Sequence, residues 1–237
     1  MVEPLTKTER EALKAIYRLA DGPGEVTSGT VAIRLGLTPG TASATVKKLA
    51  ERGLVDHRPY KGVELTPAGQ EVAVAAIRRH RICERFLADY LGYAWHDADR
   101  LASTFEHDLP REVEDRLYEA LGRPGFCPHG FPIPAPEALM IPPMPRLYDL
   151  EPGQVAQVAL SGAMDKSALD FLESLGVRPD ARVEVVAKQP FDGPIDLRVG
   201  GRSQVLGEKL ARQIHVKTVT GPEGPAAPDP NNPSRRT

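Results

Sequence analysis

A cluster of prolines divides the chain into two parts with different sequence patterns. Nine of the 23 prolines lie between Pro110 and Pro145, most of them in FCPHGFPIPAPEALMIPPMPRL. Proline lacks a backbone N–H and cannot continue a helix, so this stretch predicts an extended linker between separately folded parts. Five more prolines stand in the final GPEGPAAPDPNNPSRRT, and this polar segment predicts a disordered tail over residues 221–237.

The stretch before the linker has the element order of a winged helix-turn-helix. A capping box with an apolar stripe predicts a first helix, and a second short helix fits residues 30–35. The pair Thr38 and Pro39 is a typical start for a third helix, which Gly53 closes. Alternating stretches, LVDHR and GVELT, then predict a hairpin. We expect a DNA-binding domain over residues 1–72.

The remaining residues predict two further domains. Three amphipathic helices, near residues 67–93, 97–108 and 111–121, need a partner surface, and packing across a dimer supplies one. They predict a helical dimerisation domain, with its linker, over residues 73–146. Alternating runs such as QVAQVAL and ARVEVVAK then predict a small β-barrel over residues 147–220. The expected fold class is multi-domain and mainly helical with β structure.

Charge is distributed unevenly along a chain whose net charge is only -2. Residues 1–80 hold 12 Lys and Arg against 9 Asp and Glu, whereas residues 81–147 hold 7 against 11. A basic stripe lies within residues 34–61, and nucleic-acid-binding proteins carry such stripes to meet phosphate. The near-neutral total therefore does not exclude DNA binding.

The third helix and the hairpin carry the candidate DNA contacts. A recognition helix presents its first residues to base edges, and the wing reaches phosphates. An alternative is that the winged helix serves as a protein-interaction module. The expected DNA-binding residues are Thr38, Pro39, Gly40, Thr41, Ser43, Lys47, Lys48, Arg58, Tyr60 and Lys61.

Metal ligands are suggested by helical spacing in the second domain. His80 and Glu84 are four residues apart and project from one face of a helix. A second face carries Asp99, Ser103, Glu106 and His107. Imidazole with carboxylate oxygen suits manganese or ferrous iron, while ordinary surface ion pairs would have the same spacing. Spacing alone leaves both interpretations open.

The two cysteines, Cys83 and Cys127, are too few for a disulfide framework. We expect Cys83 in the core, and the Cys127-Pro-His129 fragment as a packed turn rather than a metal site. No hydrolase motif or phosphate-binding glycine loop is present, so we do not expect an enzyme. No apolar run is long enough to span a bilayer, and the N-terminus lacks the pattern of a signal peptide, so we expect a cytoplasmic protein.

Several stretches together resemble the diphtheria toxin repressor family of metal-dependent regulators, including its manganese branch. They are TEREALKAIYRL, VAIRLGLTPGTASATVKKLAERGLVDHRPYKGVELTPAGQEVA, RRHRICERFLADYLG, FEHDLP and CPHGFPIP. Residues 148–219 look like the small FeoA-like barrel of the longer members. The resemblance implies a homodimer on operator DNA, with metal sites that connect the DNA-binding domain to the dimer helices.

The resemblance also implies which residues bind metal. Glu11, His80, Glu84, Glu106 and His107 fall on family ligand positions. Two positions depart from the pattern: Ser103 replaces a Cys or Glu, and Asp99 replaces a His. Near the matching loop of the barrel stand the least specific candidates, Asp165 and Ser167.

The expected function is that of a metal-dependent transcriptional regulator, a repressor of metal-uptake genes. Metal would lock the dimer in a DNA-binding orientation, with Mn(II) favoured over Fe(II) because Glu11 is a hard carboxylate. The alternative is a winged-helix regulator that responds to a small molecule or to cysteine oxidation, with no metal switch.

Overall fold

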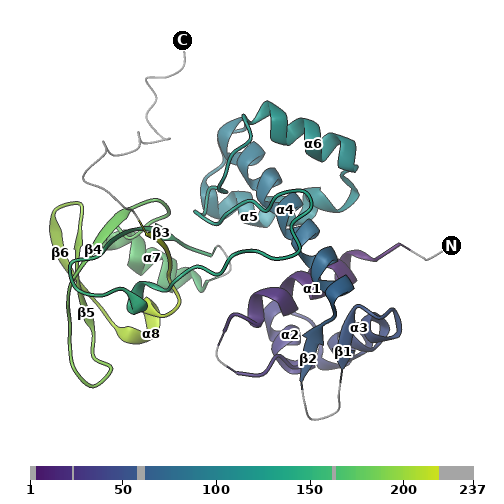
Figure 1. Cartoon of the computed structure of the whole chain (residues 1–237), viewed down its shortest axis with the longest axis horizontal. Coiled ribbons are helices and arrows are strands. Elements are labelled where there is room, and N and C mark those ends of the chain that lie inside the picture. The colour runs from purple at the N-terminus through teal and green to yellow at the C-terminus, as the bar shows by residue number, and fades with distance from the viewer. Residues whose placement is uncertain (1–3, 23, 58–61, 162–163, 219–237) are drawn as a thin grey trace.

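The computed structural model describes residues 4–22, 24–57, 62–161 and 164–218. Its elements form three groups in chain order, with the linker crossing between the second and the third (Figure 1). The expected disordered tail, residues 221–237, lies outside the described residues, as do the wing residues 58–61.

The first group is a winged helix-turn-helix. A Thr6–Glu9 capping box starts α1, and Gly36, with a φ of 63°, ends α2. The strands β1 and β2 pair antiparallel, with Val55 opposite Leu65. The second helix begins at Ser28, two residues before the sequence predicted, because Thr27 caps it. The elements are α1 (Lys7–Leu19), α2 (Ser28–Leu35), α3 (Pro39–Glu51), β1 (Val55–His57) and β2 (Val63–Leu65).

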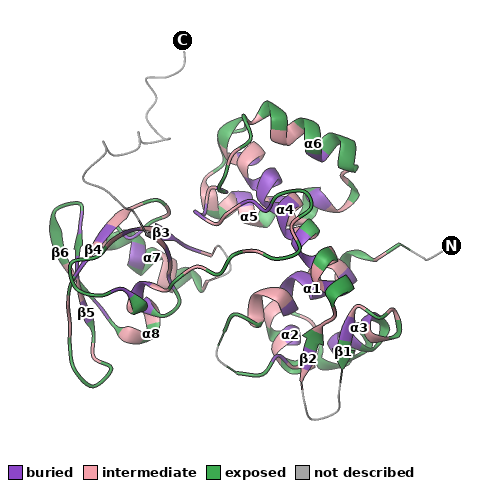
Figure 2. Ribbon diagram, viewed as in Figure 1, coloured by how far each residue is buried: buried purple, intermediate pink, exposed green. Residues whose placement is uncertain are grey.

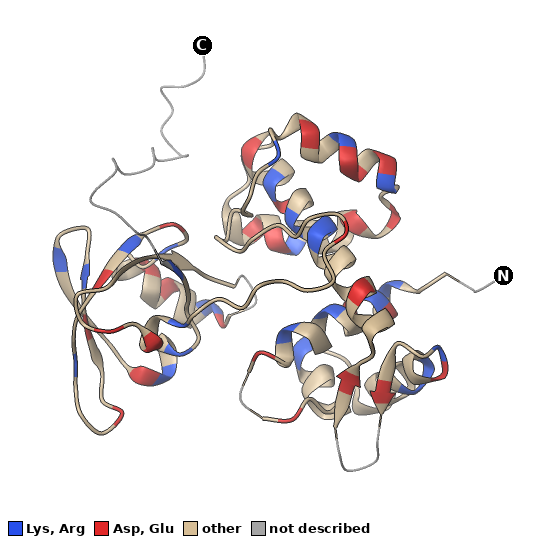
Figure 3. Ribbon diagram, viewed as in Figure 1, with Lys and Arg blue, Asp and Glu red and all other residues tan. Residues whose placement is uncertain are grey.

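The second group packs around α4, the longest helix. Buried residues run along α4, which contacts α1 of the first group as well as α5 and α6 (Figure 2). The predicted helix over 97–108 is in fact two elements, because the α-helix ends at Phe105 and a 3-10 turn follows. Acidic residues are frequent on α5 and α6 (Figure 3). The elements are α4 (Pro67–Asp89), α5 (Trp95–Phe105), η1 (Glu106–Asp108) and α6 (Arg111–Ala120).

The proline-rich linker is held against the helices rather than free. Buried Arg78 donates to the carbonyl oxygen of Pro134 at 2.6 Å, and Arg81 donates to that of Pro132. Further along, the Ile141 backbone N–H donates to the Tyr17 hydroxyl at 2.8 Å. Prolines leave carbonyls without a helical partner, and guanidinium groups satisfy two of them here.

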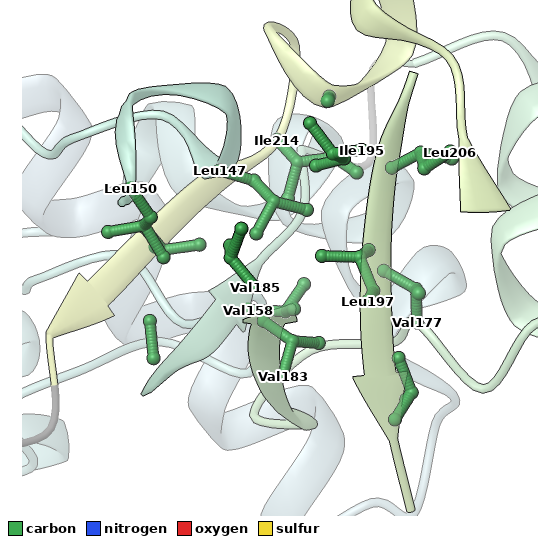
Figure 4. Close-up of a cluster of buried hydrophobic side chains, with 14 of the residues drawn as sticks. Leu147, Leu150, Val158, Val177, Val183, Val185, Ile195, Leu197, Leu206 and Ile214 are labelled. Carbon is green, nitrogen blue, oxygen red and sulfur yellow. The ribbon is translucent and has the colours of Figure 1, made fainter. Parts of the chain in front are cut away.

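The third group contains a five-stranded antiparallel sheet in the order β6-β5-β4-β3-β7. Its core takes apolar side chains from all five strands and from the segments beside them. Figure 4 shows those of β3, β4, β5 and β6 meeting Leu147, Leu150 and Ile214. Within the described residues, no helix has the length and apolar character needed to cross a membrane. The elements are η2 (Leu147–Asp149), β3 (Val155–Ala159), α7 (Lys166–Ser174), β4 (Arg182–Lys188), β5 (Ile195–Val199), β6 (Arg202–Leu206), α8 (Glu208–Ala211) and β7 (His215–Thr218).

Candidate metal centre and DNA interface

Two helical groups meet at a cluster of three ligand-type side chains, which we call the primary group: Glu11, Glu106 and His107. Their ligand atoms all lie within 4.8 Å of one another. Glu11 comes from α1 of the DNA-binding group, whereas Glu106 and His107 come from η1. His107 Nε2 lies 3.1 Å from Glu11 Oε1 and 4.0 Å from Glu106 Oε1.

A second cluster, the ancillary group, consists of His80, Glu84, Asp99, Cys127 and His129. His80, Glu84 and Asp99 form one triplet of close ligand atoms, and Glu84, Cys127 and His129 form another. Glu84 Oε1 lies 3.0 Å from His80 Nε2 and 3.3 Å from His129 Nδ1. The shared glutamate therefore joins α4, α5 and the linker in one polar cluster.

His80 connects the two groups through its two ring nitrogens. Nδ1 lies 2.7 Å from Glu106 Oε2, and Nε2 lies 3.2 Å from Asp99 Oδ1. Burial by itself would lower the pKa of His80, but the charge of Glu84 and the three carboxylate hydrogen bonds raise it to about 10. Burial would raise the pKa of Glu106, yet the hydrogen bond to His80 and the nearby Lys14 ammonium lower it to about 2. The cluster therefore favours ionised carboxylates, the form that binds cations, together with a protonated His80, which would have to release its proton before its ring could bind one.

The interpretation of the Cys127-Pro-His129 fragment as only a packed turn missed its place in the ancillary group. The fragment does turn, since the Gly130 backbone N–H donates to the Cys127 carbonyl, but the turn aims His129 at Glu84. Burial would lower the pKa of His129, and Glu84 outweighs it and raises the value to about 10. A thiol and an imidazole two residues apart were the available signal. Cys83 is fully buried in the core, as predicted.

Three other predicted ligands lie on α5 and at the start of α7. Ser103 is half-buried on α5, between Asp99 and the η1 turn. Asp165 is the N-cap of α7 and lines a cavity of about 500 Å³ that Glu84, Asp99 and His129 also line. Ser167 donates its backbone N–H to the Asp165 carboxylate at 2.8 Å, and this hydrogen bond orients that carboxylate.

Unsatisfied polar atoms provide a test of whether these residues fit a metal. In the primary group, His107 Nε2 is a buried side-chain atom without a hydrogen-bond partner, whereas Glu11 Oε1 has only the Lys14 ammonium beside it. In the ancillary group, the buried atoms without a partner include Glu84 Oε2 and His129 Nε2. Leaving these three atoms unpaired is costly unless something else binds them, and all three are oxygen or imidazole ligand atoms. Both donor sets therefore fit a divalent cation.

The recognition helix α3 separates its buried and exposed faces cleanly. Its core side consists of Ala42, Thr45, Val46 and Leu49. The predicted contacts at positions 38–41, 43, 47 and 48 are all exposed. Lys48 is partly engaged, because its Nζ lies 3.3 Å from Glu9 Oε1. Arg58, Tyr60 and Lys61 lie outside the described residues.

One prediction concerns the exposed Lys47, whose Nζ is 3.9 Å from Glu51. Lys47→Ala should weaken binding to specific and unrelated DNA alike, because a phosphate contact carries no sequence information. The slope of log affinity against log salt should fall by about 1. Fluorescence anisotropy over a salt series measures it, with exposed Lys209→Ala on α8 as the control. An unchanged slope would remove Lys47 from the interface.

Comparison with known proteins identifies all three parts. Residues 4–63 match the family description "Iron dependent repressor, N-terminal DNA binding domain", and residues 66–135 match "Iron dependent repressor, metal binding and dimerisation domain". Residues 146–218 match the FeoA domain. The iron-dependent repressor IdeR of Mycobacterium bovis is 30% identical over 228 residues, covering 91% of this chain and 99% of its own. The chain belongs to the diphtheria toxin repressor family.

Further relatives support the same family membership. The diphtheria toxin repressor of Corynebacterium efficiens is 30% identical, covering 93% of this chain and 99% of its own. A solved manganese-dependent transcriptional repressor in complex with manganese has 34% identity and a TM-score of 0.77, covering 89% of this chain and 100% of its own. The crystal structure of T. acidophilum IdeR has 26% identity and a TM-score of 0.75, covering 92% of this chain and 100% of its own.

Membership of the diphtheria toxin repressor family defines the broad function of the protein. The protein is a metal-dependent transcriptional repressor of the iron or manganese type, and it is not an enzyme. Its DNA-binding and dimerisation domains imply operator DNA and a second copy of the chain as partners. Both cysteines are buried, which weighs against the alternative in which cysteine oxidation is the signal.

Proposed function

We propose that the protein represses metal-uptake genes when Mn(II), or alternatively Fe(II), binds at the primary and ancillary groups. The observation that carries the proposal is that the residues of the primary group come from two different domains. Glu11 belongs to the DNA-binding domain, whereas Glu106 and His107 belong to the helical domain, and their ligand atoms lie within 4.8 Å. A ligand shared by these residues would connect the two domains directly.

The donor chemistry favours manganese. The primary group offers two carboxylates and one imidazole and contains no thiolate. Hard oxygen donors suit Mn(II), although affinity order alone does not select it, since Mn(II) stands lowest in the divalent series. The manganese complex of the 34% identical repressor supports the same choice. The ancillary group adds a thiol at Cys127 and is therefore the less selective of the two.

The proposed mechanism is a shift in domain orientation. When bound, a divalent cation supplies positive charge between carboxylates of two domains. Glu11 holds α1 toward η1, and α3 is fixed to α1 through the shared core of the first domain. In a dimer, this orientation would place two copies of α3 about 34 Å apart, the spacing of successive major grooves. The free energy of ordering the domains then becomes part of operator affinity.

The dimer face that we propose lies at the end of α4 and on α5. Phe86 stacks on Tyr90 at 5.8 Å and on Phe105 at 6.3 Å between ring centroids. Tyr90 is 60% exposed and Phe105 is 44% exposed, so the outer rings are open to a partner. Such an apolar surface on a helical face favours a second copy of the chain. The domain boundaries that we propose remain 1–72, 73–146 and 147–220.

Removing metal tests the proposed switch. Operator affinity of the whole protein should fall at least about tenfold on chelation, because the binding-competent orientation becomes a minor population. Adding Mn(II) should restore it, and Fe(II) under anaerobic conditions should restore it less completely. Gel shift or anisotropy with a selected operator measures the affinity, with unrelated DNA as the control. Equal affinity with and without chelator would overturn the metal switch.

A further inference from the structure

A lysine lies buried among the atoms that make up the primary group. Lys14 is only 2% exposed, although a lysine side chain is rarely buried so completely without a partner. Its Nζ lies 2.9 Å from Glu11 Oε1 and makes a short contact with Glu106 Oε1. The lysine comes from α1 and Glu106 from η1, so this contact also crosses between domains.

The ammonium uses the same two oxygens that form the primary group with His107. Glu11 Oε1 and Glu106 Oε1 are the atoms that approach His107 Nε2, at 3.1 Å and 4.0 Å. Of these three ligand atoms, the two oxygens have Lys14 beside them, while His107 Nε2 has no hydrogen-bond partner. A cation bound to all three atoms would therefore compete with Lys14 for its oxygens.

We infer that Lys14 is a built-in cation that holds Glu11 and Glu106 together without metal and must leave them before a divalent ion binds. The inference rests on the proposed primary site and concerns the metal concentration at which that site is filled. Without a cation, the buried carboxylate of Glu106 and the partly buried carboxylate of Glu11 would repel one another, and Lys14 compensates this charge. Displacing the ammonium requires that both ion pairs break, so Lys14 sets how much metal is needed.

Lys14→Met tests this role because methionine keeps an unbranched chain without the charge. Isothermal titration of the chelator-treated protein with Mn(II) should show affinity at least about tenfold higher than wild type, since no buried ion pair has to break. Thermal unfolding should show the variant less stable than wild type in chelator and restored by Mn(II). A merely structural lysine would instead lower stability equally in both conditions.

A matched control separates displacement from general electrostatics. Lys7→Met removes the same charge from the same helix two turns earlier, where the side chain is exposed. It should change Mn(II) affinity by less than about twofold, because Lys7 acts on His107 only from an exposed position, where salt screens the interaction. Lys14→Arg keeps the cation and should keep the affinity of wild type or fall below it.

The outcomes distinguish this inference from the proposed function. Equal or weaker Mn(II) affinity in Lys14→Met would overturn the role of Lys14 and leave the metal site in place. A gain in Lys7→Met as large as in Lys14→Met would also overturn it. Binding to Lys14→Met but not to wild type would support the role and overturn metal control of the natural chain. Absence of binding in both would overturn both proposals.

Discussion

Glu106→Gln is expected to remove metal control of operator binding. Glu106 is 3% exposed and touches His80 with one carboxylate oxygen and Lys14 with the other. Glutamine preserves the shape, but its amide is a poor metal ligand and brings an N–H₂ against these donors. Mn(II) affinity should fall at least about a hundredfold, since losing partners outside the ligand set already costs 10–100-fold.

The measurement is operator affinity across a Mn(II) series, with dimer content followed by sedimentation. The affinity of the variant should stay at the value wild type shows in chelator, while the dimer remains, because the proposed dimer face consists of exposed rings and Glu106 is buried. Asp108→Asn is the matched control, since it removes one carboxylate charge from the same η1 turn at an exposed position. A Glu106→Gln protein with the Mn(II) response of wild type would show that the primary group is misassigned.

Gly69→Ala should cause the largest loss of stability of any glycine-to-alanine change among the described residues of the DNA-binding half. A Cβ at Gly69 would stand 1.8 Å from the Leu54 carbonyl oxygen and 2.8 Å from its carbonyl carbon. Both are backbone atoms, held in place because the Thr66 backbone N–H donates to that oxygen at 3.1 Å. Relief therefore requires moving α4 away from the wing, at a cost of about 3 kcal/mol or more.

Circular dichroism during heating checks this expectation. A loss of that size lowers the melting temperature of a small domain by more than about 10 °C. Gly40→Ala is the control, because a Cβ there meets nothing within 4 Å and the residue lies within α3. Alanine at a helical position should leave stability unchanged or raise it by up to about 1 kcal/mol. Equal melting temperatures for Gly69→Ala and wild type would mean that α4 does not pack this closely on Leu54.

The sequence predicted the recognition helix well because its signals are local. Thr38 accepts from the Thr41 backbone N–H, Pro39 is the first helical residue, and the helix ends just before Gly53. These contacts span a few residues, so spacing alone determines them. The proximity of His80 and Glu84 could be predicted in the same way, since one helical turn sets their separation.

The sequence could not predict contacts that depend on packing between distant segments. His129 reaches Glu84 only because the linker is pinned to α4 by Arg78 and Arg81. The contact between Lys14 and Glu106 spans 92 residues and needs both domains in place. Burial also depends on the whole fold, so a lysine within a helical stripe gave no sign that it would meet two carboxylates.

The pinned linker also determines how the third domain can act on the ancillary group. Asp165 follows the linker in the chain and belongs to the third domain, yet it lines the same cavity as Glu84 and His129. A flexible tether would let the third domain explore a large volume and would dilute Asp165 near these residues. A stiff, docked tether restricts that volume, so the effective concentration of the carboxylate at the cavity is high. The docked linker thus keeps a single exposed aspartate of the third domain at the wall of this cavity, where we expect it to contribute to metal binding.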